Sequence, residues 1–177
     1  MKRLDVNKSV IELAQGDITQ EETDAIVNAA NKELTPGAGV SGAIHKAAGP
    51  ELYEETKQLG GCATGEAKIT FGHNLRARYV IHTVGPVYSG GADDAKLLNS
   101  CYAESLWLAS THGAQSVSFP AISTGVFGYP IAEAAELSLQ AVRDYLREHP
   151  ELFKVRFVLF SNEDYAAYQT ALKNLTI

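Results

Sequence analysis

Twice in this sequence a short apolar segment leads into a glycine-rich loop and then into a helix-forming segment. The first instance spans residues 24–48 and the second spans residues 115–145. A strand that ends in a loop and returns as a helix is the repeating unit of a sheet covered by helices. Because ligands bind at the carboxyl edge of such sheets, the pattern predicts that both loops lie together at one end.

The rest of the chain continues this alternation of strand and helix. Apolar runs bounded by turn residues predict further strands at residues 9–14, 66–71, 78–84 and 154–160. Apolar stripes at helical spacing predict helices at residues 51–58 and 93–112, and a last one capped by Asn162. We therefore expect residues 1–177 to form one α/β domain, a three-layer α/β/α sandwich with a mixed sheet of about six strands.

Length and charge restrict the function classes. A chain of 177 residues with 45% apolar residues has room for one ordinary domain. Its net charge of −6 argues against a surface that binds DNA or RNA through phosphates. Two cysteines outside any C-x-x-C pair, and no apolar run of membrane-spanning length, predict a cytoplasmic protein without a metal or other cofactor. We expect it to be a monomer that does not contact membranes.

The two glycine loops are suited to binding an anion. Gly37, Gly39 and Gly42 precede a good helix former, so several backbone N–H groups can point to one spot. Alone, this loop fits an ordinary turn as well as a phosphate site. A second loop with Gly125, and Asp17 at the end of another strand, favour a nucleotide-like ligand with its diphosphate between the loops.

Other polar and aromatic residues are candidates for the binding site, and several of them also fit a purely structural role. Asp17 fits a turn cap as well as an acceptor for a base amino group, and Asn28 and Asn31 follow the second strand directly. An Asn31 amide offers both a donor and an acceptor to a water molecule. We expect His82 to be a buried core histidine, and Phe160 to be either core or a stacking surface.

At the level of motifs, the chain resembles the macrodomains, a family that binds ADP-ribose. The resemblance covers nearly the whole chain and is strongest to the MacroD branch, whose members remove mono-ADP-ribose from acidic side chains and deacetylate O-acetyl-ADP-ribose. It is carried by these stretches: Gly16 to Thr19, Ala25 to Asn31, Gly39 to His45, His82 to Pro86, and Ser123 to Pro130.

The resemblance implies a role for each part of the site. Asp17 would bind the adenine amino group, with Ile18 and Phe160 beside the base, and Asn31 would bind the distal ribose. The two loops would hold the diphosphate and distal ribose. The implied ligand-binding residues are Asp17, Ile18, Asn28, Gly37, Gly39, Val40, Ser123, Thr124, Gly125, Val126, Phe127 and Phe160, and the implied catalytic residues are Asn31, Ser41 and His45.

One departure from the family pattern bears on activity. The hydrolytic branch has an aspartate where this chain has Ser41, and a glycine where it has Ala38. A serine hydroxyl orients water but does not act as a base near neutral pH. The expected function is therefore slow hydrolysis of ADP-ribosyl esters; the alternatives are a non-catalytic reader of ADP-ribose or ADP-ribosylated proteins, and a phosphatase of ADP-ribose-1″-phosphate. His45, one turn beyond Ser41, fits either the same site or a capping role.

Overall fold

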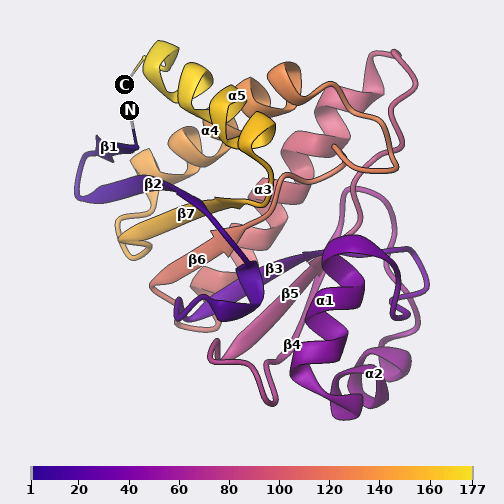
Figure 1. Cartoon of the computed structure of the whole chain (residues 1–177). Helices are drawn as coiled ribbons and strands as arrows, with labels where there is room; N and C mark the ends of the chain where they lie inside the picture. Colours follow the sequence, from indigo (N-terminus) through magenta and orange to yellow (C-terminus); the bar gives the residue numbers. More distant parts are fainter. Residues whose placement is uncertain (1, 177) are drawn as a thin grey trace.

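A computed structural model describes residues 2–176 of the chain. Strands and helices alternate through most of its length, as the sequence predicts (Figure 1). The strands are β1 (Arg3–Val6), β2 (Ser9–Gln15), β3 (Ala25–Ala29), β4 (Ala67–Phe71), β5 (Tyr79–Thr83), β6 (Ser116–Phe119) and β7 (Lys154–Leu159). The helices are α1 (Gly39–Ala48), α2 (Pro50–Thr56), α3 (Asp93–Thr111), α4 (Ile131–Glu148) and α5 (Asn162–Asn174), with 3-10 turns η1 (Ile18–Gln20) and η2 (Lys57–Leu59).

The strands form one mixed sheet in the order β1-β2-β7-β6-β3-β5-β4. The five central strands are parallel, and the two edge strands β1 and β4 pair antiparallel with β2 and β5. The sequence predicted six of these seven strands. β1 was missed because it is short and polar; it forms by pairing with β2 across a tight turn in which Asn7 has φ 55°.

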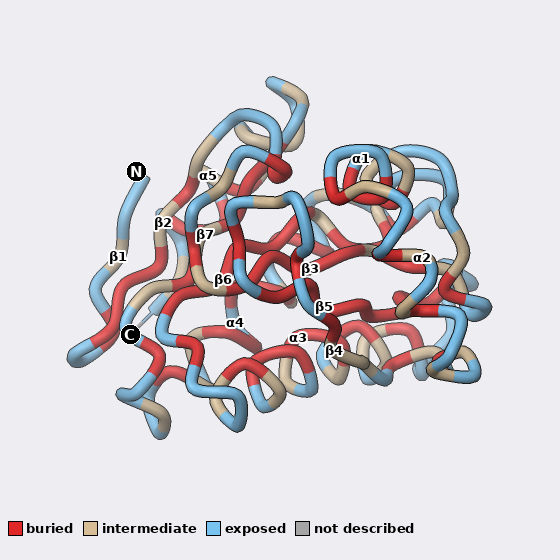
Figure 2. The backbone as a smooth tube through the Cα atoms, turned by 90° about the horizontal axis from the view of Figure 1, so that it is seen from below, coloured by how far each residue is buried: buried red, intermediate tan, exposed pale blue. Residues whose placement is uncertain are grey.

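Helices cover both faces of the sheet, which confirms the three-layer sandwich. Helices α3, α4 and α5 share the larger core with one face, where the aromatic rings of Tyr102, Phe119, Phe157 and Tyr168 are buried together. Helices α1 and α2 pack on the opposite face through a smaller core that includes Ile26 and Ile44. Figure 2 shows the strands as a mostly buried layer with α1 and α2 on one side and α3 and α4 on the other. No helix within residues 2–176 is long and apolar enough to cross a membrane.

The start of the last helix differs from the sequence prediction. Ser161, not Asn162, caps α5: its backbone is extended, and its hydroxyl accepts a hydrogen bond from the Asp164 amide at 3.0 Å. Asn162 is the first helical residue, and its side chain accepts a hydrogen bond from Gln15 at 2.6 Å. The N-cap of helix α4 is Pro130.

Candidate functional site

The candidate residues lie along the carboxyl edge of the parallel strands. In sheet order, β2 ends before Asp17, β7 before Phe160, β6 before the loop of residues 120–130, and β3 before Asn31. Three strand spacings separate β2 from β3, which is about 14 Å. Both glycine loops are thus at the same end of the sheet, as predicted, and Asp17 lies at the far end of the same edge.

A pocket of about 320 Å³ lies between the loops that follow β3 and β6. This volume is at the lower end of the range of ligand pockets, roughly 300–1,000 Å³. The predicted residues that line it are Asn31, Gly37, Gly39, Val40, Ser41, Ser123, Gly125, Val126 and Phe127. The structure adds Ala29, Ala30, Ala38, Gly85, Ala121 and Ile122. None of these side chains is charged, so backbone amides and the hydroxyls of Ser41 and Ser123 are the groups available to an anion.

The first loop turns into helix α1 earlier than the sequence indicated. The helix begins at Gly39 and includes Gly42, so these two glycines do not precede it. Gly39 has a φ of +59°, a left-handed conformation that favours glycine at the point where the loop enters the helix. No side chain caps this end, because residue 38 is an alanine. The first N–H groups of α1 therefore have no partner within the helix, and they form the positive end of its dipole beside the pocket.

Asn31 holds the first loop in shape. Its Nδ2 donates to the Thr35 carbonyl at 3.1 Å and to the Thr35 hydroxyl at 2.9 Å, and its Oδ1 accepts from the Thr35 amide at 3.0 Å. Both amide hydrogens are thus in use, and Oδ1 has one lone pair left. In this loop conformation Asn31 acts toward a ligand as an acceptor only, which the sequence could not indicate.

Ser41 is the third residue of α1 and faces the same space. It is buried, and its hydroxyl has no hydrogen-bond partner. A Cβ atom placed on Gly37 would lie 3.6 Å from both the Ser41 hydroxyl and the Asn31 amide nitrogen. The Ser41 hydroxyl and the Asn31 side-chain amide therefore lie close to the same point of the pocket wall, beside Gly37.

The second loop is held by contacts across the sheet edge. Ser123 adopts a φ of +68°, uncommon for serine, and its buried hydroxyl has no partner. Gly85, which follows β5, lies so close that a Cβ there would overlap that hydroxyl. The Thr124 hydroxyl donates to the Ala121 carbonyl at 2.8 Å, so it stabilises the turn and does not line the pocket. Nothing in the sequence near Gly85 indicated this role.

Asn28, His45 and His82 are buried and do not line the pocket. Asn28 Nδ2 donates to His82 Nδ1 at 3.1 Å, so the other ring nitrogen carries the proton and donates to the Thr70 hydroxyl at 2.9 Å. His82 is fully buried, as expected for a core histidine. His45 is also buried, and burial lowers its pKa; its ring centroid is 6.4 Å from that of His82.

The buried His82 makes stability depend on pH. Burial, and then the neighbouring His45, lower the pKa of His82 to about 3. Between about pH 6.5 and 3 the unfolded chain binds a proton that the folded chain excludes, so the free energy of unfolding falls as the pH drops, by up to about 1.4 kcal/mol per unit. We expect urea denaturation of His82→Gln between pH 7 and 4 to give a shallower dependence. The matched variant of exposed His112, His112→Gln, should keep the wild-type slope.

The far end of the edge combines one acidic and one aromatic side chain. Asp17 is exposed and caps η1: its Oδ1 accepts from the Thr19 amide at 2.9 Å and from the Thr19 hydroxyl at 2.7 Å. Both of these hydrogen bonds use Oδ1. Ile18 packs into the smaller core, while Phe160 is 83% exposed. An exposed phenylalanine beside a carboxylate offers a flat apolar surface and an acceptor to a planar base.

Comparison with known proteins places the chain in a family. Residues 27–138 match the family model of the Macro domain. The chain is 48% identical over 167 residues to an O-acetyl-ADP-ribose deacetylase of Cronobacter sakazakii, covering 92% of this chain and 93% of that protein.

Two solved structures are similar to it. One, an Oceanobacillus iheyensis macrodomain with ADP, has a TM-score of 0.93 and 45% identity, covering 97% of this chain and 94% of that one. The other, a Trypanosoma brucei macrodomain in complex with ADP-ribose, has a TM-score of 0.88 and 42% identity, covering 92% and 68%. This chain belongs to the macrodomain family.

Proposed function

We propose that this macrodomain binds ADP-ribose along the carboxyl edge of its sheet and slowly hydrolyses ADP-ribosyl esters such as O-acetyl-ADP-ribose. The observation that carries the proposal is the uncharged pocket between two amide-rich loops, in line with Asp17 and Phe160 on the same edge. The names of its relatives support both parts: one relative is called an O-acetyl-ADP-ribose deacetylase, and a structural neighbour holds ADP-ribose.

In this proposal each part of the edge binds one part of the ligand. Asp17 accepts a hydrogen bond from the adenine amino group, and Phe160 covers the base. The start of α1 and the loop of residues 121–127 bind the diphosphate through backbone amides. The pocket then takes the distal ribose, whose hydroxyls reach the remaining lone pair of Asn31. Binding needs no metal, because the amides and the helix dipole supply the positive potential.

Hydrolysis requires a water molecule beside the ester. The pocket has groups that position this water but no strong base that would remove its proton. Asn31 Oδ1 accepts one hydrogen of the water, and the Ser41 hydroxyl binds it from the other side. The ligand phosphate is the one anionic group near enough to help remove the proton. Orientation contributes to the rate even without a general base, so we expect slow turnover.

A non-catalytic reader of ADP-ribose is the second candidate function. The observation that favours it is that no charged or titratable side chain lines the pocket. An assay of ester hydrolysis on O-acetyl-ADP-ribose and on glutamate-linked ADP-ribose, run beside a binding isotherm, separates the two. Binding with turnover above the buffer rate supports the hydrolase; tight binding with no turnover supports the reader.

The contribution of Asp17 is testable by binding alone. Asp17→Ala should weaken ADP-ribose binding by about 1–3 kcal/mol, because a hydrogen bond to a charged acceptor is lost. AMP should bind wild type more weakly than ADP-ribose does, since it leaves the pocket empty. Titration calorimetry with a chelator present measures both effects. Equal affinities of wild type for AMP and ADP-ribose would contradict the assignment of the two loops.

We further propose that the chain works as a single domain with ADP-ribose or an ADP-ribosylated protein as its partner. The continuity of the larger core, which takes in residues from β1 through α5, supports the first point.

A further inference from the structure

The segment that carries Asp17 is an unusual connection between parallel strands. Sheet order places β7 and β6 between β2 and β3, so residues 16–24 cross two strands. Such crossovers usually contain an α-helix and are roughly 10–12 residues long or more, whereas this one contains only the short turn η1. Its position over the sheet therefore depends on the few side chains that fasten it.

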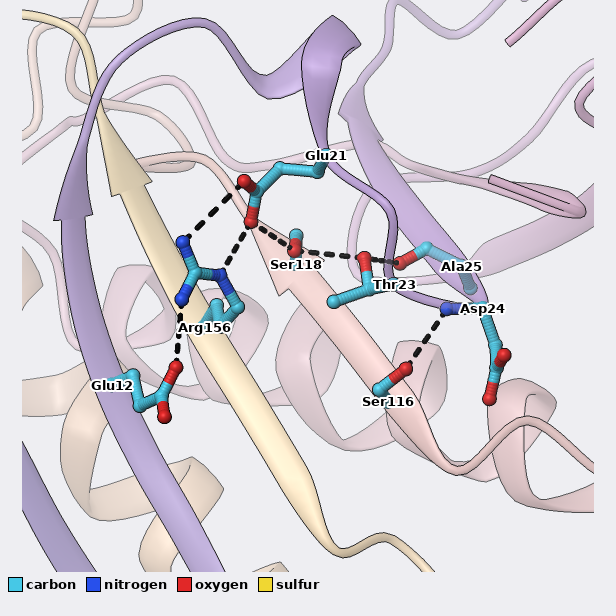
Figure 3. Close-up of polar contacts among 8 residues, drawn as sticks. All are labelled: Glu12, Glu21, Thr23, Asp24, Ala25, Ser116, Ser118 and Arg156. Carbon is cyan, nitrogen blue, oxygen red and sulfur yellow. Dashed lines mark hydrogen bonds and ion pairs between the residues drawn. The ribbon is translucent and has the colours of Figure 1, made fainter. Parts of the chain in front are cut away.

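A charged cluster fastens the middle of this crossover (Figure 3). Arg156 of β7 donates from Nε to Glu21 at 2.6 Å and from a terminal nitrogen to Glu12 of β2 at 2.7 Å. The same Glu21 oxygen accepts from the Ser118 hydroxyl of β6 at 2.8 Å. Side-chain exposure is only 27% for Arg156 and 16% for Glu21, so water screens this pair less than a surface ion pair.

The end of the crossover is fastened separately. The Asp24 amide donates to the Ser116 hydroxyl at 2.9 Å, and the Asp24 carboxylate accepts from the Gln115 amide at 2.7 Å. The Thr23 hydroxyl pairs with that of Ser118 at 2.8 Å, and because Ser118 also binds Glu21, this contact belongs to the charged cluster. The two Asp24 contacts involve neither Arg156 nor its partner Glu21, so loosening them changes the crossover at a different place.

Glu21 and Asp17 bracket the same turn. Asp17 is the N-cap of η1 and Glu21 is its C-cap, whose amide donates to the Ile18 carbonyl at 3.2 Å. A turn this short does not bend independently at its two ends, so the position of Glu21 restricts that of Asp17. Without Arg156, Glu12 and Glu21 would also repel each other, and Glu21 would turn toward water.

We infer that Arg156, acting through Glu21, is a positioning residue that orients the Asp17 carboxylate for recognition of the adenine amino group. The inference rests on the proposed function, since it assumes that Asp17 meets the base. Loss of Arg156 then affects one end of the ligand: it reduces the preference for adenine over hypoxanthine, in which a carbonyl replaces the amino group. The loops that hold the diphosphate and ribose are unchanged.

The test compares ADP-ribose with inosine diphosphate ribose by titration calorimetry. Wild type should prefer ADP-ribose, and Arg156→Met should lower this preference about three- to tenfold, because the hydrogen bond to the base is misaligned and not removed. Arg156→Lys keeps the positive charge but lacks the guanidinium group that binds Glu21 and Glu12 together. It should restore part of the preference for ADP-ribose. The control Ser116→Ala loosens the end of the same crossover and should keep the wild-type preference.

Thermal unfolding of each variant shows whether it is folded, and Glu21→Gln replaces Arg156→Met if that variant is not. Equal weakening of both ligands, with the preference unchanged, would show that Arg156 only stabilises the fold and would overturn the inference. A wild type that binds both ligands equally would overturn it as well, by removing the role of Asp17. A wild type that binds neither would instead refute the proposed function.

Discussion

Replacing Ser41 with aspartate should raise the rate of ADP-ribosyl ester hydrolysis by about 10²- to 10⁴-fold, the usual contribution of a well-placed general base. Ser41 is the third residue of α1, so a carboxylate there lies at the positive end of the helix, which keeps it ionised near neutral pH. It would face the same space beside Gly37 that the serine hydroxyl and the Asn31 amide flank. ADP-ribose affinity should change much less than the rate.

The measurement is single-turnover hydrolysis of O-acetyl-ADP-ribose, with affinity from calorimetry. Ser41→Asn is the matched control: it has the size of aspartate but cannot take up a proton, so its rate should stay near that of wild type. No turnover in wild type and none in Ser41→Asp would favour the reader. Fast wild-type turnover that survives in Ser41→Ala would show that other groups position the water.

Gly42→Ala should reduce hydrolysis about 100-fold, because displacing a reactive group by about 1 Å is enough for such a loss. In an exposed helix, alanine in place of glycine is stabilising. Here a Cβ on Gly42 would overlap the carbonyl oxygen of Gly37, which is backbone and cannot rotate away. The loop of residues 35–39 must shift, and with it the pocket wall beside Asn31. Binding of ADP-ribose should weaken with the rate.

The control for this variant is Ala47→Gly on the same helix. Ala47 is exposed and does not line the pocket, so the change lowers the stability of α1 by about 1 kcal/mol but leaves the loop in place. We expect reduced thermal stability with wild-type binding and turnover. Normal binding and turnover in Gly42→Ala would contradict the close contact between α1 and the loop.

The order of elements and the shared edge of the two loops were evident from the sequence. Apolar segments of strand length, apolar stripes at helical spacing and glycine loops are local patterns, so they predicted six of the seven strands without knowledge of the tertiary contacts. The rule that parallel strands end at one edge then brings Asp17, Asn31 and Ser123 together. The motifs at these positions indicated a macrodomain, and the comparisons confirm the family.

The tertiary structure alone decided how the functional groups are used. β1 exists because β2 offers it a partner, and Gly85 is needed because Ser123, far along the chain, lies against it. The amide hydrogens of Asn31 are donated to Thr35 within its own loop, and the spacing of residues in the sequence does not reveal this. Arg156 and Glu21, 135 residues apart, meet only because the sheet order sends the crossover over β7. Such contacts join segments that are far apart in the sequence and that only the packing of the fold brings together. No local stretch of sequence therefore predicts them.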